Sequence, residues 1–290
     1  MAEKVYIGDK LIGTTADNVE YANSGMSGVT TAKGALDNLQ TRVKAVEQSG
    51  GSGGGSSSGG DGIVTVAGNW VMLGDSITWY DKQNMQAYPT FVKQKMNFTG
   101  GYHNYAISGA RTCSSNRTTD GNGQLQKMIT ENIVPDYVTI EFGTNDFGGG
   151  FAMGTMQQFI DNVFDNTVLS TVTFYAGMSH IINGIYDVNP LAKIIIITPR
   201  KCDGHGKSGM TEHWYDQNSI SLYFQDYVDA IIEMANYMSI PVCDWWNESG
   251  SNNATMESWA RASNDWIHPN EEGHKRLATL LVDTFKKVIF

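Results

Sequence analysis

Four consecutive isoleucines at positions 194–197 constrain the fold more than any other stretch of the chain. Isoleucine is β-branched and favours strands, and a strand that is apolar at every position is buried on both of its faces. A parallel sheet covered by helices on both sides provides that environment. Residues 193–199 therefore predict a central strand of a parallel sheet.

The rest of the large domain supplies the partners of this strand. Short apolar runs predict four further strands, at residues 63–73, 102–106, 136–142 and 240–244. Segments with helical periodicity alternate with them, at residues 87–96, 155–166, 174–188, 223–238 and 270–288. Five strands that alternate with helices predict one parallel sheet with helices on both faces.

A Gly/Ser-rich stretch separates this domain from the start of the chain. Residues 49–60 carry no side chain that could enter a core, so residues 49–62 predict a flexible linker between residues 1–48 and residues 63–290. An engineered linker would have the same composition.

The N-terminal segment has two features of its own. Residues 4–13 predict a short hairpin with Gly8-Asp9 at the turn. An apolar seam with heptad spacing follows, formed by Ala32, Leu36, Leu39, Val43 and Val46. A helix of about sixteen residues is marginal in water, so the seam packs either on the large domain or on copies of itself. Its narrowness favours self-association.

Residues 19–47 resemble a segment of phage tail-fibre and other trimeric appendage proteins that leads into a trimeric coiled coil. The quoted stretches are VEYANSGMSG at residues 19–28 and TAKGALDNL at residues 31–39. The resemblance implies a homotrimer formed through residues 1–48, on a virion tail or at a cell surface. Because the N-terminus lacks the apolar core of a signal peptide, the other expected location is the cytoplasm.

Charge and hydropathy exclude two classes of partner. The net charge of −10 leaves no basic stripe to neutralise phosphates, so we expect no nucleic acid partner. No apolar run approaches the roughly 20 residues that a membrane span needs. The three cysteines are odd in number and far apart, which predicts no disulfide framework.

Ser76 lies just beyond the first strand of the sheet. Residues 70–73 are apolar, Gly74 allows a sharp turn, and the serine then stands at the carboxyl edge, where open α/β sheets bind ligands. A serine in this place is either a turn or helix-capping residue or a nucleophile. Three other residues near the same edge, Gly109, Asn145 and His268, would each be ordinary turn or surface residues if they occurred alone.

Together these residues resemble the SGNH (GDSL-type) esterase and lipase family over about residues 66–289. Its four blocks match here, in order, as Gly-Asp-Ser at 74–76, Gly109, Gly-Thr-Asn-Asp at 143–146 and Asp-Trp-Ile-His at 265–268. The resemblance implies a flavodoxin-like three-layer α/β/α fold with a five-stranded parallel sheet and no cofactor. It also implies an oxyanion hole made by Ser76, Gly109 and Asn145.

The same resemblance assigns a catalytic triad of Ser76, His268 and Asp265, and the chemistry of these residues suits the roles. A serine hydroxyl is a weak nucleophile without an adjacent base, and imidazole titrates near neutrality. Asp265, three residues before His268, can reach the second ring nitrogen and fix the tautomer. Pro269 favours an extended backbone at His268, which predicts a loop there.

Other candidate sites are weaker. Cys202, Asp203, His205 and His213 match no standard zinc spacing, so we expect no metal, and residues 200–218 predict a loop over the active edge. Aromatic residues near strand ends are either core residues or a platform for sugar rings: Trp79, Tyr80, Trp214, Trp245, Trp246, Trp259 and Trp266.

The sequence therefore predicts a serine ester hydrolase that removes O-acyl groups, most simply O-acetyl groups, from a carbohydrate. Two alternatives remain open. One is a lipid or thioester acyl hydrolase, and the other is a non-catalytic appendage protein that binds a receptor or carbohydrate.

Overall fold

The computed structural model describes residues 5–7, 10–13, 62–83, 85–112, 118–164, 172–204 and 213–290. The chain divides into two units, Met1–Gly60 and Asp61–Phe290. In the first unit, β1 (Val5–Ile7) pairs antiparallel with β2 (Lys10–Gly13), within the stretch predicted as a hairpin. The apolar heptad seam and the Gly/Ser-rich stretch lie outside the described residues, so both remain predictions.

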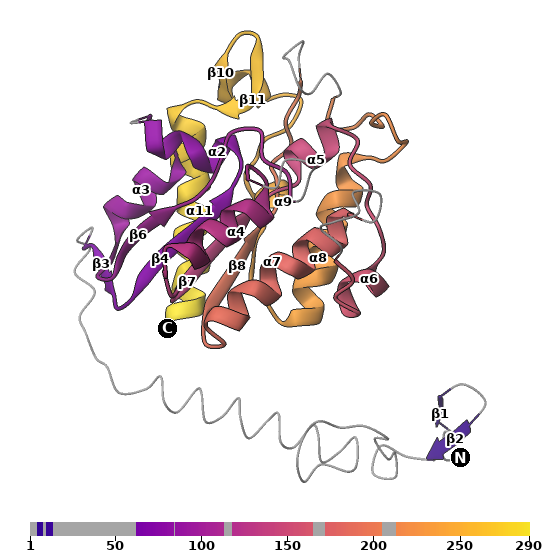
Figure 1. The fold of residues 1–290 in the computed structure, drawn as a ribbon. Coiled ribbons are helices and arrows are strands. Elements are labelled where there is room, and N and C mark those ends of the chain that lie inside the picture. The colour runs from indigo at the N-terminus through magenta and orange to yellow at the C-terminus, as the bar shows by residue number, and fades with distance from the viewer. Residues whose placement is uncertain are drawn as a thin grey trace. The chain divides into compact units, whose positions relative to one another are not determined.

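The second unit is built on a five-stranded parallel sheet (Figure 1). Its strand order is β6-β4-β7-β8-β9. The strands are β4 (Asn69–Gly74), β6 (Gly101–Asn104), β7 (Tyr137–Glu141), β8 (Lys193–Ile197) and β9 (Val242–Cys243). This is the flavodoxin-like order, in which the chain moves to one side of its first strand and then to the other. The predicted fold class is confirmed.

Successive residues of the strands enter two separate cores. Ile194 and Ile196 pack in one, and Ile195 and Ile197 in the other, because side chains alternate across a strand. The first core is covered by α4 (Gly121–Thr130), α6 (Met156–Ile160), α7 (Phe174–Val188) and α8 (Phe224–Met238). The second is covered by α3 (Tyr88–Lys95) and α11 (Glu271–Ile289). In Figure 1, α4, α7 and α8 lie in front of the sheet and α11 lies behind it.

Short elements complete the unit. The strands outside the main sheet are β3 (Val64–Val66) with its parallel partner β5 (Met96–Phe98), and β10 (Ala260–Ala262) with its antiparallel partner β11 (Asp265–Pro269). The short helices are α2 (Ser76–Trp79), the 3-10 helix η2 (Tyr80–Gln83), α5 (Thr144–Gly148), α9 (Trp245–Glu248) and α10 (Met256–Trp259). No helix of the described residues is both long enough and apolar enough to cross a membrane.

Three sequence predictions need correction. The first strand is not continuous over residues 63–73, because Gly68 has a φ of +102° and separates β3 from β4. The helix predicted over residues 155–166 ends at Ile160, and Asn162 adopts a left-handed φ of +52°. The segment around His268 is not a loop, because it forms β11.

Candidate active site

The turn that carries Ser76 is tightly fixed. Gly74 ends β4, and a Cβ at this position would lie 2.6 Å from Thr78 Oγ1, so only glycine fits. The Gln124 side chain donates to the Gly74 carbonyl and accepts from the Gly74 N–H, both at 2.9 Å. Asp75 then caps α2 by accepting the Ile77 N–H at 2.9 Å. Ser76, the first residue of that helix, is therefore held at the carboxyl edge of the sheet.

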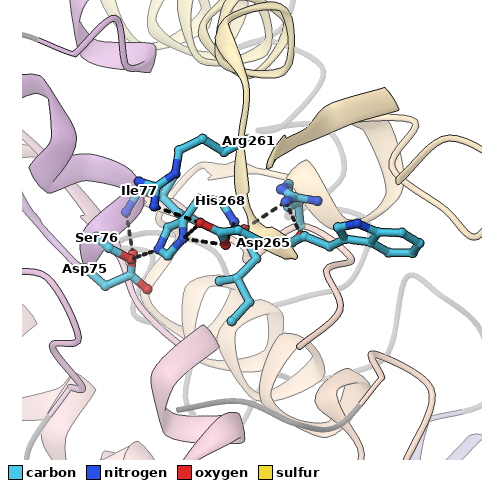
Figure 2. Close-up of polar contacts among 9 residues, drawn as sticks. Asp75, Ser76, Ile77, Arg261, Asp265 and His268 are labelled. Atoms are coloured by element: carbon cyan, nitrogen blue, oxygen red, sulfur yellow. Dashed lines mark hydrogen bonds and ion pairs between the residues drawn. The ribbon is translucent and has the colours of Figure 1, made fainter. Parts of the chain in front are cut away.

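The structure brings the three predicted triad residues together (Figure 2). His268 Nε2 lies 2.8 Å from Ser76 Oγ, although the two residues are 192 positions apart. The other ring nitrogen, Nδ1, lies 2.8 and 3.0 Å from the two carboxylate oxygens of Asp265. This arrangement lets the imidazole accept the serine proton while the carboxylate holds the Nδ1–H.

Two arginines that sequence reasoning missed hold this segment in place. Arg200 is fully buried and donates to the carbonyls of Trp266 and Ile267, both at 2.8 Å, and to Ser251 Oγ at 3.0 Å. Arg261 forms an ion pair of 2.9 Å with Asp265. The only available sequence signal was the position of Arg200, a charged residue three positions after the end of the buried strand β8.

An aromatic ring lies directly beside the histidine. The Tyr80 ring packs edge-on against His268 with 5.0 Å between centroids, and its face carries the Arg261 guanidinium at 4.7 Å. Trp79 lies next to Tyr80, with 5.5 Å between the ring centroids. Both rings are partly exposed, and the Tyr80 ring is the one that contacts His268.

Two backbone N–H groups at the site are free to bind an oxyanion. Within the described part of the chain, neither the Ser76 N–H nor the Gly109 N–H donates to another residue. Gly109 has a φ of +78°, and a Cβ there would meet nothing within 4 Å, so the backbone is open at this point. Preorganised donors of this kind stabilise the charge of a tetrahedral intermediate.

Asn145, the third predicted oxyanion donor, is placed differently. Its amide nitrogen donates to Asp75 Oδ2 at 3.0 Å and to the carbonyl of Ala110 at 3.1 Å. Both amide hydrogens therefore have acceptors inside the protein. Asn145 joins the turn at Asp75 to the Gly109 turn, and it can serve an oxyanion only by sharing or exchanging one of these bonds.

Three buried carboxyl groups surround the nucleophile turn. Burial raises the pKa of Asp75, and burial together with the charge of Asp75 raises the pKa of Glu141 well above its ordinary range. Burial also raises the pKa of Asp146 to about 6, although Thr112 donates to this carboxylate from its hydroxyl and its N–H. Sequence reasoning missed Glu141. The sequence feature that could have identified it is a single acidic residue at the end of a predicted buried strand.

Two of the candidate metal residues contact each other. Asp203 and His213 form an ion pair, Cys202 is free and buried, and His205 lies outside the described residues. No group of three or more His, Cys, Asp or Glu side chains suited to a metal ion occurs in the described ranges.

The predicted aromatic platform is only partly exposed. Trp245 and Trp246 belong to the buried core, which decides between the two alternatives for these residues. The partly exposed members are Trp79, Tyr80, Trp214, Trp259 and Trp266.

Comparison with known protein families finds a match over most of the large domain. The family model of the GDSL-like Lipase/Acylhydrolase family matches residues 72–276. No curated protein sequence matches the chain.

Solved structures share the fold. A protein from Lactobacillus plantarum aligns with a TM-score of 0.60 and 20% identity over 78% of this chain and 100% of its own. A protein described as a possible lipase from Chitinophaga pinensis aligns with a TM-score of 0.54 and 20% identity, over 76% of this chain and 98% of its own. At this level of identity the structures support the fold alone, whereas the family model spans the segment from β4 to the first turns of α11. The chain therefore belongs to the GDSL-like lipase/acylhydrolase family, whose members are ester hydrolases.

Proposed function

We propose that this protein hydrolyses O-acetyl esters on a carbohydrate, with Ser76 as nucleophile, His268 as general base and acid, and Asp265 as the group that orients the imidazole. The contact that carries the proposal is the 2.8 Å hydrogen bond between His268 Nε2 and Ser76 Oγ. A nucleophile and base within this distance, with the base oriented by a carboxylate, have the arrangement that acyl transfer requires.

The reaction follows from the positions of these groups. His268 takes the Ser76 proton as Oγ attacks the ester carbonyl carbon, and the carbonyl oxygen becomes an oxyanion that the Ser76 and Gly109 N–H groups can bind. The imidazolium then gives its proton to the leaving alcohol, which leaves an acyl-serine. Water, activated by the same imidazole, attacks the acyl carbon, releases the carboxylic acid and restores Ser76.

The surroundings of His268 support a carbohydrate as the alcohol portion. Tyr80 places a partly exposed ring directly beside the proposed base, and the partly exposed ring of Trp79 lies next to Tyr80. Flat aromatic faces next to a few polar groups form suitable contacts for a sugar ring, because its C–H faces are apolar and its rim is polar.

A series of p-nitrophenyl esters tests the acyl group. We expect the acetyl ester to be cleaved far faster than the octanoyl ester, because each added methylene must enter a packed wall at a cost of about 1–3 kcal/mol. Ser76→Ala is the matched control and should abolish hydrolysis without unfolding, since Ser76 is the first residue of α2 and belongs to neither apolar core. Equal or faster cleavage of long esters would favour a lipid or thioester substrate.

Acetate release from acetylated polysaccharides then tests the carbohydrate. Acetate release by the wild-type protein but not by Ser76→Ala is the expected result. If the protein binds the polysaccharide without releasing acetate and also cleaves no p-nitrophenyl ester, the proposed hydrolysis is wrong. The result would then favour the alternative of a non-catalytic carbohydrate-binding protein.

A further inference from the structure

Glu141 occupies an unusual position for an acid. It is the last residue of β7, has no exposed surface, and lies directly behind the nucleophile turn, because the parallel pairing of β4 and β7 places it opposite Gly74. Its Oε2 accepts a hydrogen bond from Thr78 Oγ1 at 3.1 Å. Its other oxygen, Oε1, has no partner among the described residues.

The neighbour of this carboxyl is a second carboxyl, that of Asp75. Asp75 directly follows Gly74, which the pairing of β4 and β7 places opposite Glu141, and both carboxyls are fully buried, so the charge of Asp75 acts on Glu141. Two ionised carboxylates in contact and away from water repel each other strongly, so such a pair retains a proton. A proton on one of them also provides a hydrogen bond between the two groups.

The other contacts of the pair decide which carboxyl holds the proton. Asp75 already accepts from the Ile77 N–H and the Asn145 amide. These donors favour its charged form. Glu141 has fewer donors and is fully desolvated, and burial raises its pKa well above the usual range. The proton therefore belongs on Glu141 Oε1, the atom that otherwise has no partner.

We propose that Glu141 is a positioning residue that remains a neutral acid and donates its proton to the Asp75 carboxylate, which in turn holds the Asn145 amide between the nucleophile turn and the Gly109 turn. The proposal rests on the proposed esterase function for its effect on catalysis, but the protonation of Glu141 is a property of the folded protein alone. Through Asp75, Glu141 fixes the separation of the two backbone N–H groups that face the substrate.

Four other ionisable groups, on surrounding elements, interact electrostatically with Asp75 or Glu141. They are Tyr88 on α3, Asp146 on α5, Cys202 after β8 and His268 on β11. Tyr88 and Cys202 are neutral near pH 8, because burial raises the pKa of Tyr88 well above 10 and that of Cys202 to about 12. Neither Tyr88 nor Cys202 supplies a positive charge that would stabilise the ionised form of Glu141.

Two variants test whether Glu141 acts as a neutral hydrogen-bond donor or as a charged carboxylate. They are Glu141→Gln and Glu141→Leu. In Glu141→Gln the amide oxygen can accept from Thr78 and the amide nitrogen can donate to Asp75, so we expect kcat on p-nitrophenyl acetate to stay within about threefold of wild type. Glu141→Leu has no donor, and we expect a loss of about tenfold or more in kcat with little change in KM, because the affected groups act in the transition state. A Gln variant as impaired as the Leu variant would overturn the proposal.

Infrared spectroscopy tests the protonation without an activity measurement. We expect the wild-type spectrum to contain the C=O stretch of a protonated carboxyl at about pH 8, above the pKa of about 6 at Asp146, and we expect Glu141→Gln to lose this band. Asp146→Asn is the matched control and should keep it. A wild-type spectrum without the band would overturn the proposal even if the enzyme is active. If the protein proves inactive on every ester while the band is present, the proposed function fails and the protonation of Glu141 stands.

Discussion

At the scale of single residues, Asn145 is a hydrogen-bond donor whose bonds are already formed within the protein in the absence of substrate. Its two amide hydrogens are bound to Asp75 and to the Ala110 carbonyl. We expect Asn145→Ala to lower kcat by roughly 10²–10³ with a smaller effect on KM, because the change loosens the Gly109 turn and removes an amide that could donate to the oxyanion by exchanging one of these bonds. Steady-state kinetics on p-nitrophenyl acetate measure both constants. A raised KM with kcat preserved would instead make Asn145 a substrate-binding residue.

Site residues that belong to short sequence motifs could be predicted from the sequence. Site residues that reach the site only because the folded chain buries them beside it could not. Ser76, Asp265 and His268 follow from their motifs, and the structure places them within hydrogen-bond distance. Their catalytic roles remain predictions. Arg200 and Glu141 contact the site only because the fold buries them beside it, at positions distant in the sequence.

At the scale of elements, a buried histidine joins two helices of the same face. His274 on α11 accepts the Tyr88 N–H at the start of α3 at 3.2 Å. Burial, and to a lesser degree the charges of Arg200, His268 and Arg261, lower the pKa of His274 from 6.5 to about 3. The ring must therefore stay neutral for this contact to form.

This histidine makes stability depend on acid pH. Between about pH 6.5 and 3 the unfolded chain binds a proton at His274 that the folded protein does not, so the free energy of unfolding falls as the pH falls. We expect His274→Asn, whose side-chain oxygen can also accept the Tyr88 N–H, to reduce that slope by up to about 1.4 kcal/mol per pH unit. Urea unfolding at several pH values measures it. Parallel curves for the two proteins would contradict the assignment.

Elements with a strong internal pattern were predicted well, and elements formed by packing were not. The bounds of α7 agree with the periodicity of residues 174–188. Helix α4 could not be predicted from the sequence, because two glycines occupy its first turn. A Cβ at Gly121 would lie 2.6 Å from Ile181 Cδ1 on α7, so close helix packing, rather than helix propensity, selects glycine there. The strand β11 likewise depends on its pairing with β10.

At the scale of the whole molecule, the N-terminal segment predicts an assembly. We expect the 31.8 kDa chain to form a trimer through residues 1–48, because the heptad seam is too short to support a lone helix. Light scattering on the full chain and on residues 61–290 measures this. The full chain should have three times the monomer mass, and the shorter one should be a monomer with full activity per site. A monomeric full chain at micromolar concentration would reject the trimer.

The distance in sequence between Ser76 and His268 also has a consequence for when activity can appear. The nucleophile and the sheet that supports it are synthesised first, but the base arrives 192 residues later on the small β10–β11 sheet. During translation the nascent chain can therefore fold much of its sheet while Ser76 remains without a base and poorly reactive. If His268 is the base, activity can begin only after residues 260–269 have left the ribosome and docked, so hydrolysis becomes possible only near the end of synthesis.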